Sequence, residues 1–334
     1  MMRRKSIIIL CALALWAASG CSIHEIPEGG DDNAAVTLSL DVYLDGNLAP
    51  GNTFKYATKA SGKSARYIIR FYPKLGERIA SDFAHEFVLT EKELTDQTFR
   101  LPVVPMDYHI EAWADWMYND EAFYDTSDFS AVTVYTDPYT GAVEMRDAYC
   151  GWRDLDLSGY HANSSIATSS ITLHRPLTRL QFLSTDKDDF IRYWASQVAI
   201  LDGTNVKDPD SIDLSKFRVV VTYPQYMPVS YNIREGSVSD SATGVSFETT
   251  MQELEDGTVL LAWDWVFASG DDPSVVVTIS VFDEEGRPVI SLDNLQIPLT
   301  PGTSTIVIGK LLSSQISGGI LVDPSFDGEY TIHI

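Results

Sequence analysis

The stretch that decides the fold reads Val36-Thr37-Leu38-Ser39-Leu40-Asp41-Val42-Tyr43-Leu44. Apolar and polar residues alternate along it, which is the period of a β-strand that lays one face on a core. The stretch from Tyr67 to Tyr72 follows this period in part. Turns that carry Gly, Pro or Asp, such as Asp45-Gly46-Asn47, separate such stretches, so we predict a β-sandwich and exclude the strand–helix rhythm of a nucleotide-binding sheet. Its further strands are predicted at 85–89, 98–103, 108–115 and 131–135.

A second alternating series begins near residue 166, after a stretch (139–165) that is rich in Gly, Asp and Ser and has little periodicity. One helix, with Asp188 or Asp189 as its expected cap, interrupts the series at 191–201. Its apolar residues recur at helical spacing at Phe190, Trp194, Val198 and Leu201. The predicted strands are 170–174, 177–183, 217–222, 229–233, 259–267, 275–282, 289–292, 304–308 and 330–334.

These patterns predict an all-β protein of two tandem β-sandwich domains, residues 34–165 and 166–334, with one short helix in the second. The length of 334 residues allows two domains of about 150 residues, each large enough to bury a core. The chain has 47 acidic and 24 basic side chains and a net charge of −23, which argues against nucleic-acid binding because Lys and Arg are not clustered.

The first twenty residues (1–20) have the pattern of an export signal, with Arg3, Arg4 and Lys5 before an apolar run at 7–18. As a helix this run would span about 18 Å, less than the bilayer core of about 30 Å. It closes on Ala18-Ser19-Gly20-Cys21, which resembles a bacterial lipobox in which Cys21 is acylated. A plain secretory signal with an incidental Cys is the alternative.

We therefore expect a lipid-anchored protein whose mature chain begins at Cys21, followed by a polar linker (21–33). The membrane is then a partner through the N-terminal lipid, and the expected location is the outer membrane or cell surface, with the periplasmic face left open. Of the three cysteines, Cys11 leaves with the signal and Cys21 carries lipid, so Cys150 is expected to be a buried thiol without a disulfide.

Several longer stretches carry a family resemblance. The stretch 101–115 resembles a strand pattern of Bacteroidales fimbrillin-like lipoproteins, and 173–182 resembles the opening of the second domain in one branch of that group. Together with 226–232, 243–247 and 318–330, they are similar to a lipoprotein family of unknown function, the DUF6562 type. The resemblance implies a Bacteroidota surface or outer-membrane lipoprotein with two transthyretin-like or Ig-like sandwiches, distantly related to fimbrial anchor and tip subunits, and no assigned catalytic residues.

Hard oxygen donors gather in one predicted loop, where Asp115, Asp120 and Asp125 are a weak candidate for Ca²⁺. The loop lacks EF-hand spacing, and Asp also simply forms turns. The six histidines are far apart, and no HExxH or CxxC spacing occurs, so no other metal and no cofactor is predicted.

The same loop carries Trp116, Tyr118 and Tyr124, whose rings, next to carboxylates, are candidates for stacking on a sugar. The alternative is that these aromatic residues belong to the core, as we expect for Trp113. No Gly-x-Ser-x-Gly elbow or phosphate loop occurs, and carboxylates are too plentiful to single out a catalytic pair, so no catalytic residues are predicted. Two functions remain: a non-catalytic fimbria-associated or adhesion lipoprotein that contacts other surface proteins, or a glycan-binding surface lipoprotein.

Overall fold

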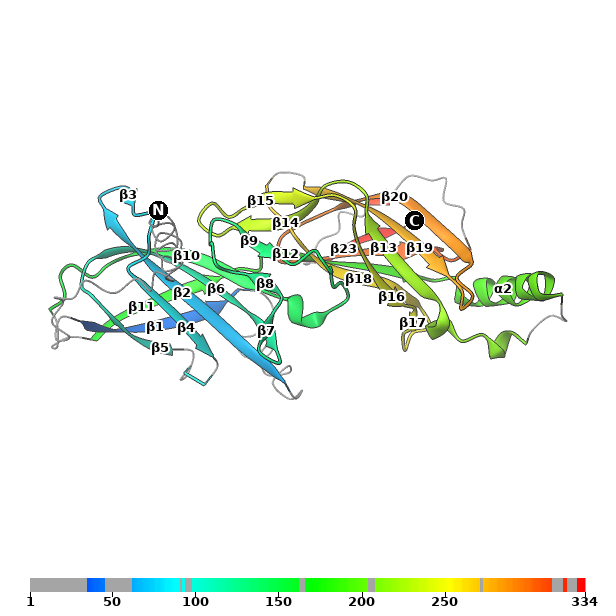
Figure 1. Cartoon of the computed structure of the whole chain (residues 1–334), viewed down its shortest axis with the longest axis horizontal. Helices are drawn as coiled ribbons and strands as arrows, with labels where there is room; N and C mark the ends of the chain where they lie inside the picture. The colour runs from blue at the N-terminus through cyan, green and yellow to red at the C-terminus, as the bar shows by residue number, and fades with distance from the viewer. Residues whose placement is uncertain are drawn as a thin grey trace, which may run out of the picture.

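The computed structural model describes residues 35–45, 62–90, 92–93, 98–161, 166–203, 208–270 and 273–313, and the backbone of 321–322 and 329–333. The predicted signal, Cys21 and the linker lie outside these residues. Two β-sandwiches lie end to end and make the molecule elongated (Figure 1). The predicted all-β fold of two sandwiches with one helix is confirmed, since α2 (Lys187–Asp202) is the only α-helix in the described part of the chain.

The first sandwich packs a three-stranded sheet on a larger one. The smaller sheet has the order β11 (Ile166–Leu173), β1 (Val36–Leu44), β5 (Thr98–Val103). The larger sheet has the order β10 (Tyr149–Asp156), β6 (Asp107–Tyr118), β2 (Lys63–Leu75), with β3 (Arg78–Ile79) and β4 (His85–Thr90) paired to β2 and β7 (Glu121–Ala122) paired to β6. The alternation in β1 places one face of the strand on the core, as predicted: every second side chain from Val36 to Val42 is buried between the two sheets.

The strand that begins at the expected domain boundary belongs to the first sandwich. β11 pairs in parallel with β1, from Thr37 opposite Ile166 to Leu44 opposite Leu173. The chain therefore leaves the first sandwich for the last time after Leu173, later than the position near 166 that the sequence indicated. Alternation shows that a strand lies on a core, but it does not show which of two cores.

A small sheet joins the two sandwiches. Its order is β15 (Ser237–Ala242), β14 (Met227–Asn232), β9 (Val132–Val134), β8 (Tyr124–Asp125). β9 pairs with β14 through Ser230 opposite Thr133 and Tyr231 opposite Val132. The chain thus crosses to the second sandwich after β7 and returns to the first in β10.

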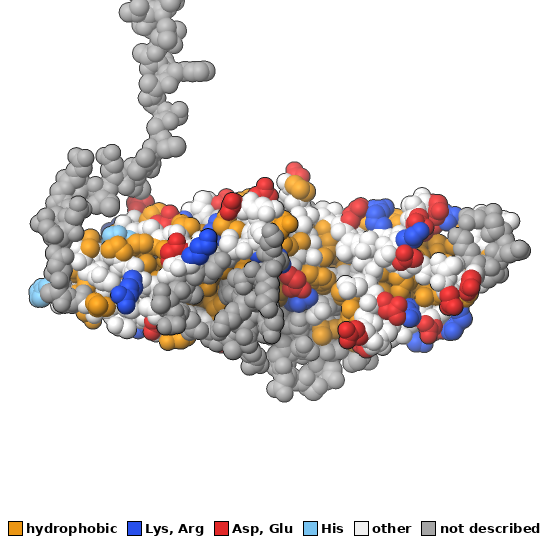
Figure 2. All heavy atoms as spheres, turned by 90° about the horizontal axis from the view of Figure 1, so that it is seen from below, with side chains coloured by type: hydrophobic (Ala, Val, Ile, Leu, Met, Phe, Trp, Pro, Cys, Tyr) orange, Lys and Arg blue, Asp and Glu red, His pale blue; other side chains and the backbone are white. Residues whose placement is uncertain are grey.

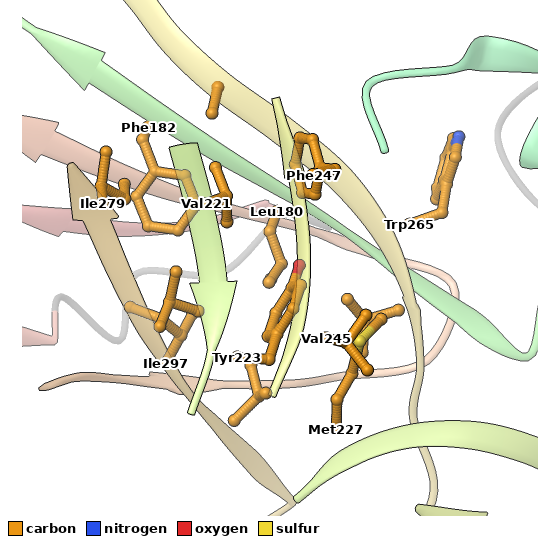
Figure 3. Packing of buried hydrophobic residues seen from close by; sticks show 14 of the residues in the cluster. Leu180, Phe182, Val221, Tyr223, Met227, Val245, Phe247, Trp265, Ile279 and Ile297 are labelled. Carbon is orange, nitrogen blue, oxygen red and sulfur yellow. The ribbon is translucent and has the colours of Figure 1, made fainter. Parts of the chain in front are cut away.

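The second sandwich has two sheets around the larger apolar core. One has the order β17 (Gln252–Glu253), β18 (Val259–Phe267), β12 (Leu177–Ser184), β21 (Ser304–Gly309), β23 (Glu329–His333), β22 (Leu321–Val322). The other has the order β16 (Val245–Thr250), β13 (Arg218–Tyr223), β19 (Ser274–Phe282), β20 (Pro288–Pro298). Side chains such as Phe182, Val221 and Ile279 meet between these sheets (Figure 3).

Helix α2 lies at the end of the molecule away from the first sandwich (Figure 1). Its start differs from the prediction: the cap position is Asp186, and Asp188 and Asp189 lie in the first turn. Asp186 makes no cap hydrogen bond; its carboxylate accepts instead from the backbone N–H groups of Leu312 and Ser313. Gly203, at φ 63°, ends the helix in the left-handed conformation that glycine adopts without strain.

The helix packs Phe190, Trp194 and Val198 on the core as predicted, whereas Leu201 is exposed. No helix in the described ranges is both long and apolar enough to cross a membrane. The described residues also include the 3₁₀ turns η1 (Glu144–Arg146), η2 (Pro209–Ser211) and η3 (Leu214–Lys216).

Strand β6 is buried on both faces over most of its length. Even-numbered residues such as Ile110 face the core of the first sandwich. On the other face Trp113 joins the core of the second sandwich, where its ring centroid lies 5.2 Å from that of Tyr124 and 6.5 Å from that of Phe267. The two sandwiches therefore share apolar contacts, and their junction is part of the fold.

Trp113→Ala tests this shared core. Removing a fully buried indole leaves a cavity, so we expect the free energy of unfolding to fall by about 3–5 kcal/mol in urea titrations followed by tyrosine fluorescence and circular dichroism. Tyr226→Ala, at an exposed position of the second sandwich, is the matched control and should change it by less than about 0.5 kcal/mol. Equal effects of the two substitutions would contradict a shared core.

Candidate functional site

Two of the three acidic residues of the predicted loop, Asp115 and Asp125, accept hydrogen bonds from other groups of the protein. Both carboxylate oxygens of buried Asp115 accept from Arg66, at 2.8 Å from Nε and 2.5 Å from Nη2. Asp125 accepts from the backbone N–H of Ser127 at 2.9 Å, which lowers the pKa of Asp125, and Asp120 is an exposed turn residue. Within the described ranges no three His, Cys, Asp or Glu side chains are placed to hold a metal ion. The weak Ca²⁺ prediction is therefore not supported by the geometry.

The three aromatic candidates separate into core and surface. Trp116 is 3% exposed and lies in the core of the first sandwich, and Tyr124 is 1% exposed and donates from its hydroxyl to the backbone oxygen of Arg146 at 2.5 Å. A ring that protein covers offers no face to a ligand. Tyr118 is 42% exposed, so it alone of the three is placed to contact one.

Tyr118 lines a surface groove of about 540 Å³ where the chain crosses between the sandwiches. One wall comes from the β6–β7 hairpin and Phe123, and the other from the segment that follows β9. The lining residues are Tyr118, Glu121, Ala122, Phe123, Val134, Tyr135, Asp137, Pro138, Thr140 and Arg146. We call this the junction groove; it joins one residue predicted from sequence, Tyr118, to several that were not.

Tyr135 is the main residue that sequence reasoning missed. The sequence predicts a strand at 131–135 that includes Tyr135, whereas β9 ends at Val134 and Tyr135 is 52% exposed. The signal was present in the sequence: Val132 and Val134 hold the buried alternate positions, and Tyr135 with Asp137-Pro138 begins a turn closed by the bridge between Thr136 and Tyr139.

Beneath the groove a buried ion pair links the two halves of the chain. Arg146, in η1, donates from Nη1 to Oδ1 of Asp264 at 2.6 Å and to the backbone oxygen of Thr140 at 3.0 Å. Its Nη2 donates to the backbone oxygen of Trp265 at 2.8 Å. Neither Arg146 nor Asp264 reaches solvent to any useful extent, since both are buried in the junction.

Two tyrosines also donate hydrogen bonds to Asp264. The hydroxyls of Tyr139 and Tyr223 each donate to Oδ2 at 2.7 Å, and the guanidinium of Arg146 lies 4.5 Å from the centroid of the Tyr139 ring. Burial raises the pKa of both phenols well above the ordinary value, and the Asp264 charge adds to this shift. Both tyrosines therefore stay protonated and keep donating at neutral pH.

Further polar contacts hold the junction at its edges. Arg175 donates to Asp147 at 2.6 Å and lies over the ring of Tyr149. Arg234, from the β14–β15 turn, donates to buried Glu111 of β6 at 2.6 Å. Charged residues on the second face of β6 are thus paired with arginines, which explains how a polar strand face is buried.

Cys150 lies in the same junction. It is a buried free thiol, as expected, and burial raises its pKa, so it is poorly placed to act as a thiolate nucleophile.

Asp264→Ala tests the buried pair. The substitution leaves Arg146 charged and unpaired, and we expect the free energy of unfolding to fall by about 3–5 kcal/mol. The double variant Arg146→Met/Asp264→Leu removes both charges, and its loss should be well below the sum of the single losses. Glu248→Ala, which breaks the exposed pair with Arg218, is the matched control and should cost no more than about 1 kcal/mol. Additive losses in the double variant would show that the two residues do not act as a pair.

Comparison with known proteins gives a family and weak structural likenesses. The profile of a family described as "Family of unknown function (DUF6562)" matches residues 29–334. No curated protein matches the chain. The fimbrial anchor protein Mfa2 from Porphyromonas gingivalis is similar at a TM-score of 0.39 and 12% identity, covering 78% of this chain and 82% of that one. A fimbrial assembly protein from Parabacteroides distasonis is similar at a TM-score of 0.41 and 11% identity, covering 86% and 94%.

Proposed function

This chain belongs to the DUF6562 family, and we propose that it is a lipid-anchored surface protein that acts by non-catalytic contact with other molecules. The observation that carries the proposal is the joining of two sandwiches into one elongated body, on a chain whose N-terminal segment ends in a lipobox-like sequence. Such a body holds a contact surface away from a membrane.

The anchor would act on the first sandwich. Residues 22–34 separate Cys21 from the first described residue and span at most about 45 Å when extended. β1 follows them directly and lies in the first sandwich, whereas α2 lies at the opposite end (Figure 1). Anchoring at Cys21 would therefore place the first sandwich next to the membrane, the junction groove further out, and α2 furthest away.

The surface chemistry suits a protein held near anionic headgroups. On the face drawn in Figure 2, acidic and basic side chains are interspersed toward the α2 end. Lys187 of α2 pairs with Glu253, and Lys216 of η3 pairs with Glu284. The net charge of −23 keeps such a surface soluble and away from lipid.

The proposed partner is a fimbrial or other surface protein. This choice follows from the resemblance of residues 101–115 and 173–182 to fimbrillin-like lipoproteins. We propose a non-catalytic function for two reasons. The sequence carries no catalytic motif, and the described lining of the junction groove includes no His, Ser or Cys.

Cys21→Ala tests the anchor. Wild-type protein should incorporate radiolabelled palmitate and sediment with membranes, and Cys21→Ala should lose the label and appear in the soluble fraction. Cys150→Ala is the matched control and should be labelled like the wild type, because its thiol is buried. Undiminished labelling of Cys21→Ala would contradict the proposal.

The contact role is tested on intact cells. Cross-linking followed by native extraction should recover the chain with other surface proteins, and deletion of the gene should reduce adhesion of the cells. Recovery of the monomer alone, together with unchanged adhesion, would overturn the proposed role even where palmitate labelling succeeds.

A further inference from the structure

The junction groove presents two tyrosine rings to solvent. Tyr118 comes from the end of β6 and Tyr135 from the segment after β9, and they are 42% and 52% exposed. Phe123 also lines the groove. Its side chain is partly buried and packs on the core of the second sandwich. Exposed aromatic faces are costly to leave in water, and they match the apolar CH face of a pyranose ring.

The rim of the groove supplies hydrogen-bond acceptors. Glu121 and Asp137 are exposed, and within the described residues neither takes part in an ion pair. Thr140 adds an exposed hydroxyl. Carboxylates accept hydrogen bonds from sugar hydroxyls, so apolar rings beside carboxylates form a surface with the mixed polarity of a carbohydrate.

The charges of the groove select against anionic ligands. Arg146 is the only cation among the described lining residues, and its guanidinium is buried and bonded to Asp264. Lys63 lies opposite Tyr118 in the β2–β6 pair, but it is not among the residues that line the groove. An anionic sugar would therefore meet excess negative charge in a chain that is already acidic overall.

We propose that the junction groove binds a neutral pyranose unit of a glycan, with Tyr118 and Tyr135 as stacking residues and Glu121 and Asp137 as hydroxyl acceptors. The proposal rests on the proposed function, since a surface-anchored chain is the kind of protein that meets such glycans. It adds the chemical class of the ligand and places the contact at the junction between the sandwiches.

A sugar fits the groove better than an extended peptide does. Peptides that bind to sheets do so through a strand edge and its main-chain groups. The outer wall of the groove is formed by the turn at 136–139, which is closed by the bridge between Thr136 and Tyr139 and is not part of a strand.

The first experiment screens full-length protein, purified in detergent and fluorescently labelled, against immobilised saccharides. The neutral probes are cellohexaose, maltohexaose, xylohexaose and yeast mannan, and the acidic probes are polygalacturonate, sialyllactose and heparin; a random peptide array is screened in parallel. We expect binding to at least one neutral probe and to none of the acidic ones. Binding to peptides or acidic saccharides alone, or to no probe, would overturn the proposal.

Variants locate the site. Tyr118→Ala and Tyr135→Ala should each weaken binding of the best neutral probe at least tenfold in calorimetric titration, because each removes one stacking face. Tyr135→Phe keeps the ring and should stay within about threefold of the wild type. Tyr226→Ala removes a tyrosine that is 75% exposed on the second sandwich outside the groove, and it should leave binding unchanged. Unchanged binding by both Tyr118→Ala and Tyr135→Ala would also overturn the assignment.

Two further measurements distinguish loss of the binding site from misfolding of a variant and from failure of the lipid anchor. Thermal unfolding of each variant should match the wild type, since Tyr118 and Tyr135 are surface residues; a variant with a lowered midpoint is replaced by Tyr135→Gln or Tyr118→Gln. Palmitate labelling of the same preparation reports on the anchor. If the wild-type protein binds no saccharide probe while its palmitate labelling is intact, the groove assignment is overturned and the proposed surface role still stands.

Discussion

The buried pair between Arg146 and Asp264 constrains the junction more than any other contact. Two charges in an apolar core are tolerated only when their hydrogen-bonding groups are satisfied. Thr140, Trp265, Tyr139 and Tyr223 supply partners to the pair from segments that are far apart in the sequence, and Nε of Arg146 is left without a hydrogen-bond partner among the described residues. These contacts hold the segment from 135 to 148, which includes the outer wall of the junction groove, against Asp264 and Trp265 of the second sandwich.

Much of the fold could be predicted from the sequence because one face of most strands is apolar. β1, β12 and β13 bury alternate side chains, and their periodicity predicts this directly. The partner of β11 could not be predicted in this way, because parallel pairing with β1 joins residues that are far apart along the chain. Periodicity carries no information on such distant neighbours.

The candidate site was harder to predict because it depends on what covers β6. Alternation in β6 marks His109, Glu111 and Asp115 as a polar face, and a polar face normally lies in water. Here arginines such as Arg66 and Arg234 pair with these acids, so the face is buried. Trp116 is buried on the opposite face of β6, in the core of the first sandwich, and Tyr124 is buried beside Trp113 in the core of the second. Tyr118 lies at the end of the strand and is exposed.

The position of β1 determines how the molecule would carry mechanical load. β1 is hydrogen-bonded on both sides, to β5 and in parallel to β11, and β11 leads into the second sandwich. A pull from the N-terminal side of β1 and an opposing pull through the end of β11 act along the strands in opposite directions. The bonds between the two strands then share the force in shear and must fail together, whereas strands pulled apart from one end lose their bonds one at a time. A tether at the N-terminus would thus be attached to the strand best placed to resist drag on a cell surface.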